Sequence, residues 1–405
     1  MKKNKITYKN FIQKKYLDKK LQQKLNKNYL NIFNKISKSL DLSFDPLFSL
    51  SKKYKLKFKT QDLKKFKKFK TIIVVGMGGS ILGSEAIYCF LNKKIKKKFI
   101  FLDDIDEDKL KELKNNKNLK NFLFIVISKS GNTIETLSNL LALQIIKKDS
   151  KNLIIISEKT NNPLYSISKK MNLLHIEHKK SIGGRFSVFS DVGMVPAYFM
   201  GLNLINFRQK LLVHLSKKNK NYLKNSVIAI ANLFQRKKFK NLILLNYSPR
   251  LEKFLFWSQQ LIAESLGKKG KGFLPLISQV PKDHHSLLQL YSDGPKDKIY
   301  YIFSEKNKKG AKIQSKNLNK QLKFLNNKNL NLIKNFQKDS LIKLFKEKQI
   351  PFREFEFNNQ SEQVLGELFS YFILETVLIA KLSDINPFDQ PGVEQVKKET
   401  KQLLN

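Results

Sequence analysis

The chain of 405 residues is 41% hydrophobic, which suits a globular protein of two ordinary domains, and we expect neither a membrane span nor a signal peptide. Its single cysteine, Cys89, excludes an internal disulfide and a cysteine-rich metal site, and it suits a cytoplasmic protein. The 73 Lys and only five Arg outnumber the 33 acidic residues and give a net charge of +45. Because the lysines are dispersed along the chain and Arg is scarce, this charge indicates solvated surfaces with weak, nonspecific affinity for polyanions rather than a specific nucleic-acid site.

The first 60 residues are rich in Lys and carry apolar side chains at roughly helical spacing. This pattern predicts one or two packed helices. The apolar positions are Phe11, Ile12, Tyr16, Leu17, Leu21, Leu25, Ile32, Phe33 and Ile36.

Strands and helices alternate from residue 71 to about residue 203. The apolar runs predict strands at 71–75, 99–102, 122–127, 152–156 and 173–176. Helices are predicted at 81–91, 107–115, 133–147, 160–170 and 190–201. Five strands joined by crossover helices predict a doubly wound parallel sheet.

A helical stretch at about 205–238 leads into a second α/β unit. Its strands are predicted at 241–246, 298–303 and 352–357, and its helices at 250–266, 339–349 and 361–382. The segment 304–335 is rich in Lys, Asn and Gln and gives no clear prediction, and a last helix is predicted at 392–404. We therefore expect a helical segment at 1–60, domains at 61–204 and 205–385, and a C-terminal turn and helix at 386–405.

A loop rich in hydroxyl groups follows the strand predicted at 122–127. It contains Ser128, Lys129, Ser130, Gly131 and Thr133. The free N–H groups and the dipole of the next helix favour an anion there, and the hydroxyls add neutral donors. The loop is thus a candidate phosphate cradle, although Ser and Thr are also ordinary helix caps.

A glycine-rich turn, G-M-G-G-S at 76–80, follows the strand predicted at 71–75. It contains G-x-G but lacks the full G-x-G-x-x-G spacing of a dinucleotide site. Two such turns in one parallel sheet converge at the carboxyl ends of the strands, where open α/β sheets bind ligands.

The positions of Arg185 and Glu264 in the sequence make both residues candidates for a functional role. Arg185 lies in the loop G-G-R-F-S at 183–187, and an Arg kept in so Lys-rich a chain suggests a need for its rigid planar fork. Glu264 falls near the C-terminal end of a predicted helix, where the dipole disfavours a carboxylate. A surface Arg in a turn and an exposed helical Glu are the alternatives.

Two adjacent histidines, His284 and His285, precede Gln289. Adjacent side chains point in different directions, which argues against a shared metal, and H-E-x-x-H is absent. One of them is a candidate acid/base group, and a structural or exposed His is the alternative. The later turn F-D-Q-P-G leads into a helix with Lys397, which is no signal by itself among 73 lysines.

Six motifs in this order resemble the phosphoglucose isomerase (glucose-6-phosphate isomerase) family, over about residues 70–400 and in its compact bacterial form. They are G-M-G-G-S-x-L-G, S-K-S-G-N-T-x-E-T, G-G-R-F-S, E-S-x-G-K, H-S-x-x-Q and F-D-Q-P-G-V-E-x-x-K. The resemblance implies an α/β fold of two SIS-type three-layer α/β/α sandwich domains with parallel sheets, plus N- and C-terminal helices. It implies conversion of glucose 6-phosphate to fructose 6-phosphate through ring opening and a cis-enediol, with no metal or organic cofactor. It also implies a cytoplasmic homodimer in which the neighbouring subunit supplies the catalytic histidine.

The resemblance implies a role for each matching residue. Arg185 would stabilise the enediolate, Glu264 would carry the proton between C2 and C1, His285 would open the ring, and Lys397 would lie near the ring oxygen. Ser80, Ser128, Lys129, Ser130 and Thr133 match the positions that would hold the sugar phosphate, and Gly79, Gly184 and Gln390 are further expected substrate-binding positions.

Some assignments stay open. Ser130 stands where the family more often has Thr, but the hydroxyl is kept. His285 is preferred over His284 because Gln289 follows it by four residues, and Lys398 is the alternative to Lys397 if the register slips. A non-catalytic SIS-fold regulator could lose Glu264, Arg185 or Lys397, all of which are present. An isomerase that also acts on mannose 6-phosphate would keep the whole set.

Overall fold

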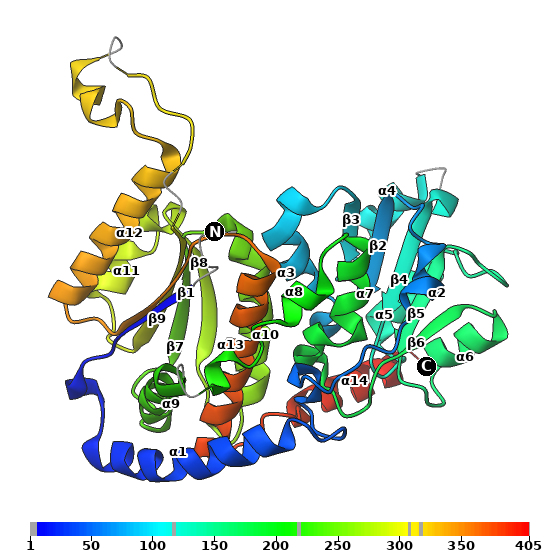
Figure 1. Cartoon of the computed structure of the whole chain (residues 1–405), viewed down its shortest axis with the longest axis horizontal. Helices are drawn as coiled ribbons and strands as arrows, with labels where there is room; N and C mark the ends of the chain where they lie inside the picture. Colours follow the sequence, from blue (N-terminus) through cyan, green and yellow to red (C-terminus); the bar gives the residue numbers. More distant parts are fainter. Residues whose placement is uncertain (1–5, 116–118, 217–219, 307–308, 316–318, 405) are drawn as a thin grey trace.

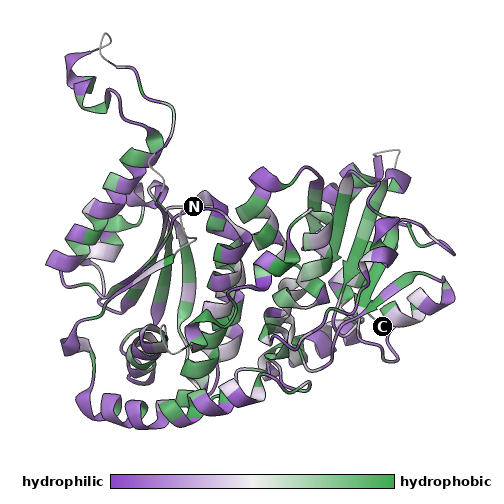
Figure 2. Cartoon of the chain, in the orientation of Figure 1, coloured by the Kyte–Doolittle hydropathy of each residue, from purple (hydrophilic) through white to green (hydrophobic). Residues whose placement is uncertain are grey.

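Two five-stranded sheets lie side by side in the computed structural model, each covered by helices (Figure 1). The structure describes residues 6–115, 119–216, 220–306, 309–315 and 319–404. Apolar residues predominate in the strands of both sheets, and polar residues are frequent on the outer helices (Figure 2).

The first sheet is parallel throughout, which confirms the doubly wound prediction. Its strand order is β3-β2-β4-β5-β6. The strands are β2 (Thr71–Gly76), β3 (Lys98–Leu102), β4 (Phe122–Ile127), β5 (Leu153–Ser157) and β6 (Leu174–Glu177). The chain moves outward in opposite directions from β2 and from β4, so the two adjacent carboxyl ends form the crevice where such sheets bind ligands.

The predicted helices of this unit are present. They are α3 (Leu82–Leu91), α4 (Glu107–Asn115), α5 (Ile134–Ala142), α6 (Pro163–Lys170) and α7 (Asp191–Phe199), with 3-10 turns η3 (Gly78–Ser80), η4 (Asn92–Lys94), η5 (Leu119–Asn121) and η6 (Gly184–Phe189). Helix α5 ends five residues before the predicted end, ahead of Gln144, whose φ of 54° does not continue a helix.

The second sheet has the order β1-β10-β9-β7-β8. Its strands are β1 (Ile6–Phe11), β7 (Asn241–Asn246), β8 (Leu274–Gln279), β9 (Lys298–Glu305) and β10 (Phe352–Phe357). Strand β1 lies where a helix is predicted, and it runs antiparallel to β10 in an otherwise parallel sheet. It forms because β10 offers an unpaired edge, which the local spacing does not reveal. Strand β8 is unpredicted because it contains Pro275, which an edge strand tolerates.

Helices of the second unit and of the termini complete the fold. They are α1 (Lys19–Ser39), α2 (Thr60–Lys64), α8 (Leu204–Arg208), α9 (Lys220–Gln235), α10 (Glu252–Leu266), α11 (Leu288–Asp293), α12 (Leu330–Glu347), α13 (Glu362–Leu382) and α14 (Pro391–Leu403). The 3-10 turns are η1 (Lys14–Tyr16), η2 (Phe48–Leu50), η7 (Val213–Leu215), η8 (Pro249–Leu251), η9 (Lys282–His285) and η10 (Lys320–Leu325). Helix α12 begins nine residues before the predicted start, inside the segment without a prediction.

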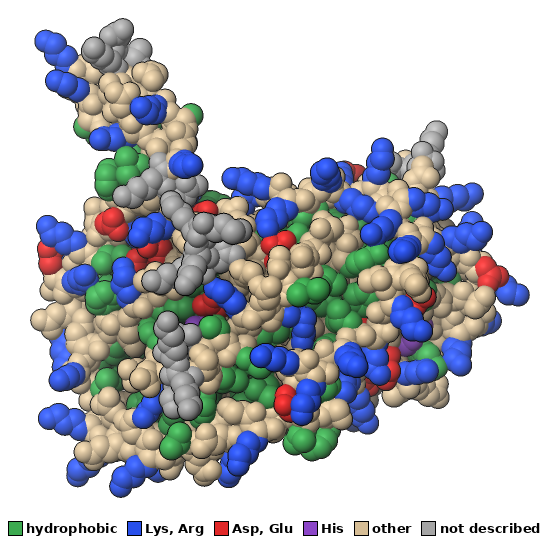
Figure 3. Space-filling model, in the orientation of Figure 1, with side chains coloured by type: hydrophobic (Ala, Val, Ile, Leu, Met, Phe, Trp, Pro, Cys, Tyr) green, Lys and Arg blue, Asp and Glu red, His purple; other side chains and the backbone are tan. Residues whose placement is uncertain are grey.

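One hydrophobic cluster joins the two units. It contains Ile72 and Ile125 of the first sheet and Leu242 and Phe303 of the second. Helix α13 is long and apolar enough to cross a membrane by length and composition, but 94% of that window is buried inside the protein, as in a core helix. Lys side chains are scattered over the visible face rather than gathered into one stripe (Figure 3), in agreement with solvated lysines.

Candidate active site

The hydroxyl-rich loop lies at the carboxyl end of β4 and leads into α5. Ser128 Oγ and Thr133 Oγ1 are hydrogen-bonded at 2.8 Å. Thr133 occupies the N-cap position of α5, yet its hydroxyl does not cap the helix, unlike Asn162, whose Oδ1 accepts from Tyr165 N on α6. The first-turn N–H groups of α5 therefore donate no hydrogen bond to the N-cap side chain, which favours the anion site over an ordinary cap.

Gly131 gives this loop its tight shape. Its φ is 67°, and a Cβ at this position would come within 1.8 Å of Asn162 Oδ1. Because Asn162 caps α6, the loop and the start of that helix are fixed against each other.

Positive charge gathers beside the loop. Burial lowers the pKa of Lys129, although Glu158 Oε1 at 3.7 Å opposes the shift, and the charges of Arg185 and Lys180 lower this pKa further. The positive charges of Lys129, Arg185 and Lys180 repel one another, and a bound anion would offset this repulsion.

The turn after β2 touches the Arg185 loop directly. A Cβ on Gly79 would lie 2.2 Å from Gly184 C and 2.5 Å from Arg185 N, so only glycine allows this approach. Ser187 Oγ donates to Gly79 O at 3.3 Å. The contact brings Arg185 next to the crevice between β2 and β4.

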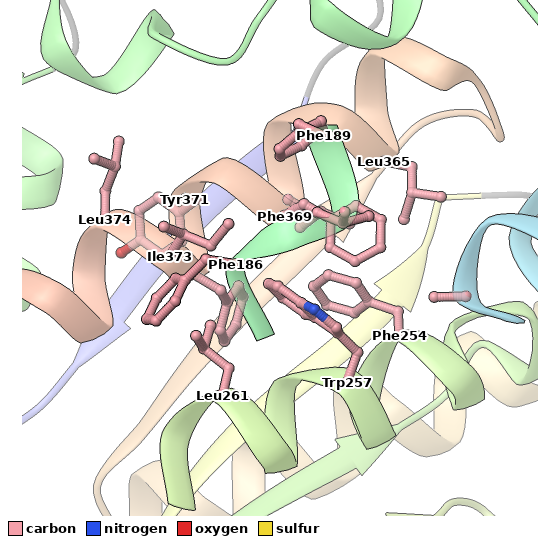
Figure 4. Packing of buried hydrophobic residues seen from close by; sticks show 14 of the residues in the cluster. Phe186, Phe189, Phe254, Trp257, Leu261, Leu365, Phe369, Tyr371, Ile373 and Leu374 are labelled. Carbon is pink, nitrogen blue, oxygen red and sulfur yellow. The ribbon is translucent and has the colours of Figure 1, made fainter. Parts of the chain in front are cut away.

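Aromatic packing anchors the backbone of Arg185. Figure 4 shows Phe186 and Phe189 of η6 among side chains of α10 and α13, including Trp257 and Phe369. Phe189 packs edge-on against Phe369 at 5.9 Å between ring centroids. Because these rings are buried and closely packed, they fix the backbone from which the Arg185 side chain extends.

All five N–H groups of Arg185 are hydrogen-bonded within the protein. Nε donates to Ser265 Oγ at 2.9 Å, and Nη1 donates to Glu264 Oε2 and to Gln390 Oε1, each at 2.9 Å. Nη2 donates to Pro387 O and to Asp389 O. The side chain is 3% exposed, so this network replaces its hydration.

Glu264 is held on both carboxylate oxygens. Oε2 accepts from Arg185, and Oε1 accepts from Gln260 Nε2 at 2.9 Å, one turn earlier on α10. The side chain keeps 25% exposure, so a substrate can reach it. Arg185 also offsets the unfavourable dipole at this end of the helix. The Glu264 carboxylate is thus both fixed in orientation and open to solvent, which a general base requires.

The remaining predicted residues lie farther out. Gln390 joins the network through Arg185, directly before α14. Lys397 and its alternative Lys398 lie on α14 with exposed side chains. Ser80 and Ser128 are buried at the crevice, whereas Ser130 is exposed at the loop surface.

The two histidines lie at the other end of α10. Gln279, at the end of β8, donates to Glu252, the first residue of α10, and η9 with both histidines follows that strand. Glu264 lies twelve positions after Glu252 on this helix, which corresponds to a distance of about 18 Å. His285 is exposed, whereas His284 Nε2 is bonded to Tyr247 Oη at 2.8 Å. The structure does not bring His285 to Glu264 of the same chain.

A family model described as phosphoglucose isomerase matches residues 51–273. The chain belongs to this family. A probable glucose-6-phosphate isomerase of Methanococcus maripaludis is 32% identical over 349 residues, covering 82% of this chain and 78% of the relative. The glucose-6-phosphate isomerase of Methanocaldococcus jannaschii is 31% identical, with coverages of 84% and 86%.

Solved structures share the family fold. A glucose-6-phosphate isomerase of Chlamydia trachomatis superposes with a TM-score of 0.77 at 18% identity, covering 98% of this chain and 88% of that one. A hypothetical protein of Thermus thermophilus superposes with a TM-score of 0.78 at 22% identity, with 95% of each chain covered.

Two side chains of the network, those of Gln260 and Ser265, were not predicted to belong to the site, and Ser265 is part of the family motif E-S-x-G-K. The i,i+4 spacing of Gln260 and Glu264 on a helix was an available signal. Nothing in the sequence indicates that Ser265 accepts from Arg185.

Proposed function

We propose that this protein interconverts glucose 6-phosphate and fructose 6-phosphate at a site built around Arg185 and Glu264. The observation that carries the proposal is their 2.9 Å ion pair, placed beside an anion cradle by the Gly79–Gly184 contact. An anchored phosphate, an oriented carboxylate and a fixed positive charge are what proton transfer next to a sugar carbonyl requires.

The phosphate of the sugar binds at the β4–α5 loop. Hydroxyl groups donate hydrogen bonds to the phosphate from Ser80, Ser128, Ser130 and Thr133. Lys129 adds a positive charge, and the first turn of α5 adds backbone N–H donors. The uncapped start of α5 supports this assignment.

Glu264 removes the C2 proton of the open-chain aldose, and the electron pair of that C–H bond forms the C1=C2 bond and leaves negative charge on O1 of the enediolate. O1 then gains a proton, O2 loses its proton to form the C2 carbonyl, and Glu264 returns its proton to C1. Arg185 stabilises the enediolate oxygen by its charge. Because all five of its N–H groups already have partners, it offers no spare donor, and a direct bond would require displacing Glu264 or Gln390.

Ring opening needs a separate acid and base, which we assign to His285 and Lys397. The exposure of His285 and its separation from Glu264 along α10 support supply of this histidine by a second copy of the chain. We therefore propose a homodimer with shared active sites.

The activity is tested by a coupled assay of fructose 6-phosphate conversion by the full chain. Turnover that disappears in Glu264→Gln supports the proposal, and binding of the sugar phosphate without turnover by the wild type overturns it in favour of a regulator.

The shared site is tested by mixing two inactive variants, Glu264→Gln and His285→Ala, and refolding them together. A mixed dimer has one site with both residues intact, so random pairing should restore about a quarter of the wild-type activity. If both residues came from one chain, the mixture would stay inactive.

A further inference from the structure

The turn before α14 is held by two cations from different elements. Arg185 of η6 donates to Pro387 O and Asp389 O. Lys268, just beyond the end of α10, donates to Asn386 O, to Asp389 O and to Asp389 Oδ1, each at 2.6 Å. The carbonyl oxygen of Asp389 is thus shared by both cations.

The contacts of Lys268 are those of a fixed side chain rather than a solvated lysine. Its side chain is 11% exposed, unlike most lysines of this surface. The hydrogen bond from Lys268 is the main cause that lowers the pKa of the Asp389 carboxyl, so the carboxylate stays charged. Three short charge-assisted bonds use all three N–H donors of the ammonium group.

The backbone of Lys268 is fixed relative to Glu264. Lys268 N donates to Lys271 O, and Lys271 N donates to Lys268 O, each at 3.0 Å. Gly267 N closes the last turn of α10 by donating to Ala263 O at 2.8 Å. One rigid stretch, residues 264–268, therefore carries the proposed base, the Ser265 partner of Arg185 and the clamp on the 386–389 turn.

We propose that Lys268 is a positioning residue that holds the turn at 386–390 against Glu264 and Arg185. Through this turn it sets the place of Gln390, which shares Arg185 Nη1 with Glu264, and the start of α14, which carries Lys397. Its effect on rate rests on the proposed function, but its effect on the turn does not.

Neighbouring lysines provide matched controls. Lys269 Nζ donates to Asp384 O at 3.3 Å and is exposed, and Lys271 Nζ donates to Ser383 O at 3.2 Å. These single, longer bonds reach the end of α13 rather than the turn. Lys269→Met therefore removes the same charge from the same segment and leaves the clamp intact.

The test compares Lys268→Met, Lys268→Arg and Lys269→Met in the full chain by amide hydrogen exchange and steady-state kinetics. In Lys268→Met we expect exchange at 386–398 to rise at least ~10-fold while exchange in β4 and α13 stays unchanged. We expect kcat to fall ~10-fold with KM within ~3-fold, because the phosphate loop is untouched. Lys268→Arg should recover most of both effects, and Lys269→Met should match the wild type.

A double-mutant cycle locates the path of the effect. If Lys268 acts through the turn, Lys268→Met should lower kcat much less in a Gln390→Ala background than in the wild type. Fully additive effects would overturn this route.

The hydrogen-exchange and kinetic measurements can also contradict the proposal. Unchanged exchange at 386–398 in Lys268→Met overturns the clamp, and so does a rise over the whole chain, which would mean general unfolding. Increased local exchange with unchanged kcat overturns the positioning role in catalysis. A wild type without isomerase activity overturns the proposed function instead, and the exchange measurement still decides whether Lys268 holds the turn.

Discussion

Arg185 and Glu264 form a 2.9 Å ion pair across 79 positions of sequence and between units built on different sheets. Arg185 lies on η6, which follows β6 of the first sheet, and Glu264 lies in the last turn of α10, which follows β7 of the second. The proposed proton-transfer chemistry therefore lies where the two units meet, so movement of one unit against the other would change the distance between base and cation.

Glu264→Gln should keep the fold and phosphate binding but lose proton transfer. The amide still accepts from Arg185, so the network is largely preserved. We expect kcat to fall at least ~10²-fold, in line with general-base contributions, while the KM for fructose 6-phosphate changes little. Steady-state kinetics would measure kcat and KM, and near-normal turnover would show that Glu264 is not the base.

Arg185→Lys keeps the charge but loses the fork. An ammonium group has three donors for the five acceptors that Arg185 serves, so buried acceptors are left unpaired. We expect kcat to fall much more than KM rises, because without the fork the positive charge is no longer held in the same place, and its place matters most in the transition state. A pure rise in KM would make Arg185 a substrate-binding residue instead.

Thr133→Val tests the phosphate loop. It removes the hydroxyl that bonds Ser128 and leaves the shape of the side chain nearly unchanged. We expect KM for fructose 6-phosphate to rise ~10-fold with kcat within ~3-fold, the result of lost uniform binding. Inorganic phosphate should weaken as an inhibitor in parallel. An unchanged KM would mean that the loop does not hold the phosphate.

Variants of the two histidines should differ in their activity on cyclic and open-chain substrates. His285→Ala should slow turnover of cyclic glucose 6-phosphate strongly, while an open-chain analogue still exchanges its C2 proton through Glu264. His284→Ala should affect both less and should lower stability, because it loses the bond to Tyr247. The reverse pattern would place the register one residue off, and loss of exchange in both variants would show that the histidine acts beyond ring opening.

His178 should make stability fall in mild acid. Its side chain is 2% exposed, and burial together with the Lys129 charge lowers its pKa from 6.5 to about 4. Between these two pKa values the unfolded chain therefore binds more protons than the folded protein. The contribution of His178 to the free energy of unfolding is thus fully present above pH 6.5 and is lost as the pH falls toward 4. From pH 7 to pH 5 this residue should remove about 2 kcal/mol of unfolding free energy.

Urea unfolding of the wild type and of His178→Leu at both pH values would measure this difference. The variant should lose correspondingly less stability than the wild type between pH 7 and pH 5. Equal losses in the two proteins would show that His178 is not the titrating group.

The predicted elements that the structure confirms are those with strong local patterns. The strands at 71–76 and 122–127 are uninterrupted apolar runs, and buried parallel strands require such runs. Strands β1 and β8 were missed because both are edge strands, whose short or interrupted patterns take shape through pairing with a neighbour.

By itself the sequence determined the first parallel sheet, the two strand-to-helix turns and the family, because these depend on local periodicity and on ordered motifs. The tertiary structure decided which of these residues meet. It joined Gly79 to Gly184, gave all five donors of Arg185 a partner, placed Lys268 on the turn at 386–389, and separated His285 from Glu264 by the length of α10. These relationships depend on how two sheets and their helices pack, and side-chain contacts across such packing are set by the whole core rather than by any local stretch of the chain.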